Sequence, residues 1–184
     1  TAGWYQWQEK NFGAGNFFFG NGPVDCGMGQ KGDVWFLGGT DFAAAYEREC
    51  TDNVPAGKRL FFPIINVLYW NEPLTTLERR EAARDAIGDS GPGEFELDAC
   101  YLDATLDDEP VIFSGTAIQR LQSPLFEYDG DPKALADGFW VLLPKLSGGE
   151  HTVRFTGSLC LTGTGDPVLD VDVSYELTVA GGGD

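Results

Sequence analysis

The sequence has few basic side chains and a single histidine, His151. Its 184 residues contain 12 Lys and Arg against 29 Asp and Glu, a formal net charge of −17. Nucleic-acid binding needs a basic surface, so this charge balance argues against nucleic acid as a partner. Ser–His–Asp or Cys–His catalysis would depend on His151 alone. We interpret His151 instead as a structural side chain that satisfies a neighbouring turn.

Long apolar runs and common catalytic or metal-binding motifs are absent as well. No run approaches the ~20 apolar residues of a membrane-spanning helix, so we expect no membrane span. No Cys-x-x-Cys pair occurs, which argues against a zinc site. Ser123 and Ser158 lack the flanking glycines of a Gly-x-Ser-x-Gly turn, which argues against a nucleophilic serine hydrolase.

Four widely spaced cysteines are present: Cys26, Cys50, Cys100 and Cys160. An even number at wide spacing is typical of disulfide bonds in an oxidising compartment, whereas buried free thiols in a cytosolic protein are the alternative. Of the three pairings allowed, we favour Cys26–Cys50 with Cys100–Cys160, because neither loop is nested inside the other. The chain begins at Thr1 without methionine, which fits removal of an export signal. We therefore expect a secreted, extracellular protein.

The 25 glycines and 10 prolines separate short apolar runs, as is typical of an all-β chain. Residues 169–179 alternate strictly between apolar and polar, which predicts a half-buried strand whose outward carboxylates discourage edge-to-edge pairing. Residues 151–159 alternate in the same way. The runs 34–37 and 60–67 are almost continuously apolar, which predicts strands buried on both faces, or on one face with a loop over the other. Pro63 then requires an edge position or a bulge.

One segment departs from the β pattern. Between Thr75 and Gly88, a capping residue, helix-forming residues and a terminating glycine predict a short surface helix over about residues 76–87. Its thin apolar stripe consists of Leu77, Ala83 and Ile87. We expect a single all-β domain over residues 1–184, a β-sandwich or jelly roll with this one short helix.

Several segments resemble the motifs of a broad family of secreted, β-rich proteins that has no assigned activity. The motifs are VWFLGGT at residues 34–40, VPAGKRLFFPIIN at 54–66, DGFWVLLP at 137–144 and GEHTVRF at 149–155, with a Trp-rich opening at 4–7. The resemblance implies secretion, a β-rich fold and pairing of Cys26 with Cys50. It implies no catalytic activity, and Cys100 and Cys160 lie outside its motifs.

Two acidic clusters make calcium the best cofactor candidate. The first contains Asp103, Asp107 and Asp108, and the second contains Asp129 and Asp131. Carboxylates that lie close together in turns supply the hard oxygen ligands that Ca²⁺ prefers. Neither cluster has EF-hand spacing, and ordinary turn aspartates are the alternative interpretation.

The N-terminal arm, residues 1–20, is the candidate segment for binding or assembly because it is rich in aromatic side chains. The candidates are Trp4, Tyr5, Trp7, Phe17, Phe18 and Phe19. An apolar N-terminal segment is a natural donor for strand addition between subunits. A sugar-stacking platform and a lid on the protein's own core are alternatives. In an extended chain Trp4 and Trp7 face opposite sides, which weakens the platform interpretation.

The first functional hypothesis is therefore a non-catalytic extracellular structural or surface protein, a subunit of a self-assembling fibre or filament joined by strand addition. A carbohydrate-binding module is the alternative. A second alternative is a glycan-degrading enzyme that uses two of the 29 carboxylates. Such an enzyme needs one carboxyl group with a raised pKa. An acidic surface that only keeps the protein soluble is the simpler interpretation of those carboxylates.

Overall fold

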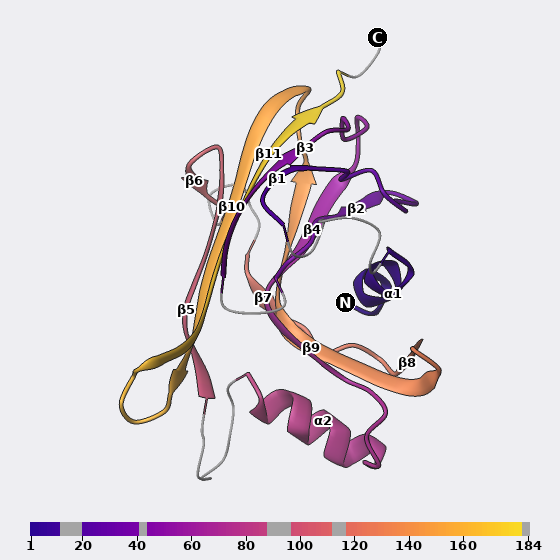
Figure 1. The fold of residues 1–184 in the computed structure, drawn as a ribbon, viewed down its shortest axis with the longest axis vertical. Coiled ribbons are helices and arrows are strands. Elements are labelled where there is room, and N and C mark those ends of the chain that lie inside the picture. Colours follow the sequence, from indigo (N-terminus) through magenta and orange to yellow (C-terminus); the bar gives the residue numbers. More distant parts are fainter. Residues whose placement is uncertain (12–19, 41–43, 88–96, 112–116, 182–184) are drawn as a thin grey trace.

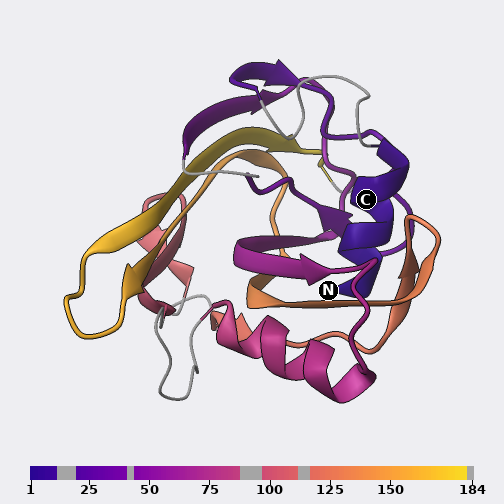
Figure 2. The same ribbon diagram turned by 60° about the horizontal axis from the view of Figure 1, so that its bottom comes forward.

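The computed structural model describes residues 1–11, 20–40, 44–87, 97–111 and 117–181, which form an open β-sandwich (Figure 1). Sheet A has the strand order β1-β3-β11-β10-β5-β6, and sheet B has the order β2-β4-β9-β7, with β8 paired to β9. Both α1 and α2 pack against sheet B, and neither lies over the outer face of sheet A (Figures 1 and 2). The prediction of an all-β sandwich is confirmed.

The bounds of the elements follow the chain. Sheet A consists of β1 (Gly22–Val24), β3 (Ala44–Cys50), β5 (Leu97–Leu106), β6 (Glu109–Pro110), β10 (Gly149–Leu161) and β11 (Pro167–Val179). Sheet B consists of β2 (Val34–Phe36), β4 (Arg59–Tyr69), β7 (Gln119–Arg120) and β9 (Asp131–Lys145), and β8 is Phe126–Tyr128. The helices are α1 (Ala2–Asn11) and α2 (Thr76–Asp85).

The alternating segments form the two long strands at the centre of sheet A. β11 buries Val173 and Tyr175 and turns the intervening polar side chains outward, as the alternation predicts. β10 does the same with Val153 and Phe155. However, β11 lies between β3 and β10, so its carboxylates lie on a sheet face. The prediction that they protect a sheet edge is wrong.

Strand β4 is buried on both faces, as its continuous apolar run predicts. On one face, the ring of Phe62 stacks on Phe155 of sheet A at 4.7 Å. On the other face, Phe61 stacks on Trp140 at 5.2 Å, beneath α1. The register with β9 shifts between Pro63 and Ile65, which confirms the predicted bulge.

The N-terminal arm differs from its prediction, because residues 2–11 form helix α1 on the protein's own core. Helical spacing brings Trp4 and Trp7 to the same side with Tyr5 beside them, whereas an extended chain would separate them. All three side chains are buried, with Trp4 only 3% exposed. These residues are therefore neither a platform nor a donor strand here. The other candidates of the arm, Phe17, Phe18 and Phe19, lie outside the described residues.

Helix α2 begins where the sequence predicts. Thr75 and Glu78 form a reciprocal capping box, and Ala86 is the C-cap residue. Gly88, the predicted terminator, lies outside the described residues. Leu77 was expected on the buried stripe but is 65% exposed, and the charged Arg79 takes its place in the interior. Arg79 can be buried because a carboxylate partner meets it there, as shown below.

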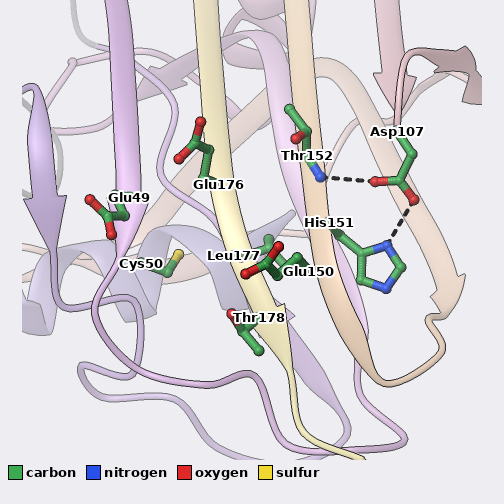
Figure 3. A pocket seen from close by; sticks show the side chains of 9 residues that line it. All are labelled: Glu49, Cys50, Asp107, Glu150, His151, Thr152, Glu176, Leu177 and Thr178. Atoms are coloured by element: carbon green, nitrogen blue, oxygen red, sulfur yellow. Dashed lines mark hydrogen bonds and ion pairs between the residues drawn. The ribbon is translucent and has the colours of Figure 1, made fainter.

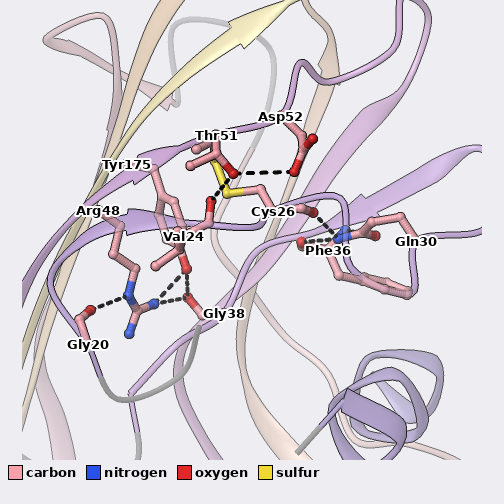
Figure 4. The surroundings of a disulfide bond; sticks show 11 residues. Gly20, Val24, Cys26, Gln30, Phe36, Gly38, Arg48, Thr51, Asp52 and Tyr175 are labelled. Atoms are coloured by element: carbon pink, nitrogen blue, oxygen red, sulfur yellow. Dashed lines mark hydrogen bonds between the residues drawn. A yellow bond between two sulfur atoms is a disulfide. The ribbon is translucent and has the colours of Figure 1, made fainter. Parts of the chain in front are cut away.

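Both predicted disulfides are present. Cys26 pairs with Cys50 and Cys100 pairs with Cys160. The first bond lies beside the buried Arg48, which donates to the carbonyl of Gly38 (Figure 4). The second joins the neighbouring strands β5 and β10 at a bulge.

In the described part of the chain, no helix has the length and apolar character needed to cross a membrane.

Candidate functional site

The outer face of sheet A is a polar surface built by four strands. Side chains along β3, β5, β10 and β11 point alternately inward and outward, and most of the outward ones are polar. These outward side chains are mostly carboxylates and hydroxyls, including Glu49, Asp103, Thr156, Ser158, Asp172 and Glu176. Because both helices pack on sheet B, neither of them covers this face.

A groove of about 430 Å³ runs over β5, β10 and β11 on this face. Strand register builds it from two cross-strand rows. One row is Tyr101–Ser158–Asp170, and the next is Asp103–Thr156–Asp172. Tyr101 is 53% exposed, so its ring forms an aromatic wall in a groove that is otherwise lined mainly by polar groups.

Two side-chain pairs hold the polar groups of the groove in place. Arg154 donates from Nε and Nη2 to both carboxylate oxygens of Asp172, at 3.0 and 2.8 Å. Ser158 Oγ donates to Asp170 Oδ1 at 2.6 Å. Exposed ion pairs of this kind add little stability. Their main effect is to give a guanidinium and two carboxylates fixed directions in an open groove.

His151 is among the residues that line a neighbouring depression at the start of β10 (Figure 3). Its Nδ1 is 2.8 Å from Asp107 Oδ2, and its Nε2 is 3.0 Å from the carbonyl oxygen of Ser147. Both partners are acceptors, so both bonds form only with the imidazolium. Partial burial lowers the pKa of His151, but the bonds to Asp107 and Ser147 raise it more, and the net shift is upward. His151 thus joins two turns, in line with its structural interpretation.

The five candidate calcium ligands lie in two separate regions, and Asp103 and Asp108 of the first cluster both line the groove. Asp103 lies on the outer face of β5, and Asp107 and Asp108 occupy the β5–β6 turn with φ of 54° and 65°. Asp129 and Asp131 lie at the β8–β9 turn, distant from the first cluster (Figure 1). Among the described residues, no group of three or more His, Cys, Asp or Glu side chains is arranged to hold a metal ion. Calcium binding stays a prediction.

Asp131 has a protein partner. Arg79 Nη1 donates to Asp131 Oδ2 at 2.6 Å, and the backbone amides of Asn71 and Lys133 donate to the same carboxylate, each at 2.8 Å. The hydrogen bond from Arg79 is the main reason that the pKa of Asp131 falls to about 2. The pair fastens α2 to the β8–β9 turn.

We expect Asp131→Asn to destabilise the protein in a pH-dependent way. The pKa is about 2 in the folded state against 3.8 ordinarily, so the unfolded chain binds the proton more readily. The stabilisation by the carboxylate is therefore complete above about pH 5 and disappears as the pH falls through about 2. Urea unfolding of wild type and variant should show a gap at pH 6 that narrows toward pH 2. The same gap for Asp129→Asn, in the same turn, would contradict this assignment.

The groove was not predicted as a polymer-binding site, although two residues that line it, Asp103 and Asp108, were predicted as calcium ligands. Alternation within residues 151–159 and 169–179 predicts which side chains point outward. It does not predict that β5 lies next to β10, which is the contact that brings Tyr101 beside Ser158. The signal that the sequence carries for this site is the alternation that turns Ser158 and Asp170 outward.

Comparisons with known proteins add no assignment. No family model matches the chain, no curated protein matches it, and no solved structure matches its fold. The motifs behind the family resemblance fall mainly on strands: residues 34–40 include β2, 54–66 begin β4, and 137–144 and 149–155 lie in β9 and β10. The family itself stays a resemblance, and functional conclusions rest on the geometry of the chain.

Proposed function

We propose that this chain is a non-catalytic extracellular protein that binds a hydroxyl-rich polymer, a polysaccharide, in the groove on the outer face of sheet A. The observation that carries the proposal is the exposed ring of Tyr101 in a groove of fixed polar groups. The two disulfides support an extracellular setting, because such bonds persist in oxidising compartments.

The groove offers the contacts that a sugar requires. Sugar hydroxyls donate and accept hydrogen bonds, and the groove presents acceptors in Asp170 and Asp172 and donors in Arg154. The flat aromatic ring of Tyr101 offers an apolar surface for the C–H face of a sugar ring. Few, well-placed polar groups around an apolar contact are typical of ligand sites.

The alternatives have less support from the geometry. The aromatic side chains of α1 are buried, so they do not supply a sugar platform. Trp70 is 39% exposed and contacts Tyr128 at 5.6 Å, but the polar groove is elsewhere. A glycan-degrading enzyme needs a carboxylic acid in an apolar pocket, whereas the carboxylates of the groove face a guanidinium and a hydroxyl. Binding without bond cleavage is the simpler conclusion.

Tyr101→Ala is expected to weaken polysaccharide binding by about tenfold, because the variant loses the stacking surface and keeps the polar groups. The test is calorimetric titration with a panel of soluble polysaccharides, with reducing ends assayed in the same samples. Trp70→Ala removes an exposed aromatic ring outside the groove and should bind like the wild type.

Three results would overturn the proposal. The first is a wild-type protein that binds no polysaccharide in the panel. The second is Tyr101→Ala that binds as tightly as the wild type. The third is release of reducing sugar by the wild type, which would make the protein an enzyme.

A further inference from the structure

In two places, two side chains of like charge lie directly opposite each other on neighbouring strands. One pair is negative and the other is positive. Glu49 of β3 pairs in register with Glu176 of β11, on the outer face of sheet A. Arg59 of β4 pairs in register with Lys145 of β9, in sheet B. Like charges directly opposite on a sheet destabilise it. A second charged surface that neutralised either pair would remove this cost.

The negative pair belongs to an acidic patch, defined as Glu49, Glu150 and Glu176. These side chains line a depression of about 350 Å³ (Figure 3). Within the described part of the chain, no hydrogen bond or ion pair engages any of the three carboxylates. The imidazolium of His151 is paired with the neighbouring Asp107, so it does not neutralise the patch.

The positive pair belongs to a basic patch, which contains a large share of the chain's 12 Lys and Arg residues. The patch is defined as Lys10, Lys31, Lys58, Arg59 and Lys145. Lys10 and Lys31 line one pocket, the ammonium of Lys58 contacts the carbonyl of Gly32, and the amide of Arg59 donates to Asp33 at 3.1 Å. The segment around residues 31–33 therefore lies beside Lys58 and Arg59, and Lys145 lies opposite Arg59 in register. Lys58 is partly covered, and the other four side chains of the patch are exposed.

We propose that the acidic patch of one copy of this chain binds the basic patch of a second copy. The partner is a second copy because the two patches have opposite charge. Each patch contains a pair of like charges on neighbouring strands, and the other patch would neutralise that pair. The contact joins two different surfaces, so a joined pair still has one free acidic patch and one free basic patch. Repetition of such a heterologous contact gives a ring or a filament.

The acidic patch and the polysaccharide groove lie beside each other on the same sheet. Asp172 of the groove lies four residues before Glu176 on β11, a distance of about 13 Å along a strand. Joined copies would present the groove repeatedly, and repeated sites on one polymer raise the overall affinity by avidity. The inference does not depend on polysaccharide binding, and its test contains no polysaccharide.

The test is sedimentation of the full chain at high concentration and about 0.15 M salt, where charges in direct contact still attract. A zero-length carbodiimide reagent, which couples carboxylates to amines, identifies the contact by mass spectrometry. We expect oligomers of the wild type, with Lys58 or Lys145 coupled to Glu49, Glu150 or Glu176 of another copy. We also expect 1 M salt to dissociate these oligomers.

Charge reversal makes the test specific. Variant one carries Glu49→Lys and Glu176→Lys, and variant two carries Arg59→Glu and Lys145→Glu. Each alone should associate at least about tenfold more weakly than the wild type, and an equimolar mixture should associate again because its contacts are complementary. Glu72→Lys with Glu81→Lys changes the net charge as variant one does, but lies outside the patch and should leave association unchanged. Unaltered circular dichroism shows that the variants fold.

Two results would overturn the inference. The first is a wild type that stays monomeric with no coupling between copies. The second is a mixture of the two variants that associates no better than each variant alone.

Discussion

Replacing Trp4 with alanine is expected to lower the free energy of unfolding by about 3–5 kcal/mol, the usual cost of removing a buried tryptophan side chain. The ring of Trp4 meets Trp140 edge to face at 5.7 Å, between α1 and sheet B. Its Nε1 also donates to the buried carbonyl of Leu37 at 2.8 Å. Truncation would open a cavity and leave that carbonyl without this donor.

Urea unfolding followed by circular dichroism measures this effect. Trp70→Ala is the matched control, because it removes the same side chain from a site that is 39% exposed, and its loss should be several-fold smaller. Equal losses for the two variants would mean that α1 does not pack on sheet B. The N-terminal segment would then again be available as a donor strand for another subunit.

The second large effect is expected from the disulfides. Replacing Cys100 and Cys160 with alanine should lower the free energy of unfolding by about 4 kcal/mol, because this bond closes a loop with a sequence separation of 60. The Cys26–Cys50 bond, with a separation of 24, should be worth about 3.5 kcal/mol on the same chain-entropy basis. Unfolding of the two double-alanine variants in urea measures both values.

Accessibility gives the two disulfides different reactivity. Cys100 is exposed on β5, whereas Cys26 is fully buried. A thiolate reductant must reach a sulfur atom, so mild reduction followed by alkylation should label Cys100 and Cys160 before Cys26 and Cys50. Prior labelling of Cys26 would contradict the burial of that bond. Four reactive thiols in untreated protein would contradict both disulfides and the extracellular proposal.

The elements with a strong local pattern could be predicted from the sequence. Residues 169–179 need only a period of two to specify a half-buried strand, and Thr75 with Glu78 specifies where α2 begins. The bulge at Pro63 was predictable because proline has no backbone N–H to donate to a neighbouring strand. In each case the physical signal lies within a few neighbouring residues.

Helix α1 could not be predicted in this way. A helix of 10 residues is marginal alone, and this one gains its stability by burying aromatic rings on β4 and β9, far along the chain. The buried Arg79 is similar, because its partner Asp131 lies 52 residues away. Tertiary contacts of this kind override local propensity.

The candidate site was predictable only in part, for a related reason. Alternation predicts that Ser158 and Asp170 point outward, but the groove depends on which strands are neighbours. The opposed Glu49 and Glu176 come from strands β3 and β11, which are distant in sequence and parallel in space. Register across such strands is set by packing of the whole sandwich, which no single segment encodes.

The most direct test of the account is to locate a bound polysaccharide by NMR. With the polysaccharide from the panel that binds most tightly, we expect the amide signals of Tyr101, Thr156 and Asp172 on the outer face of sheet A to shift in a saturable way. The signals of Trp70 and Tyr128 should not shift. Shifts centred on Trp70, or no saturable shift with any polysaccharide, would contradict the assignment of this face as the binding surface.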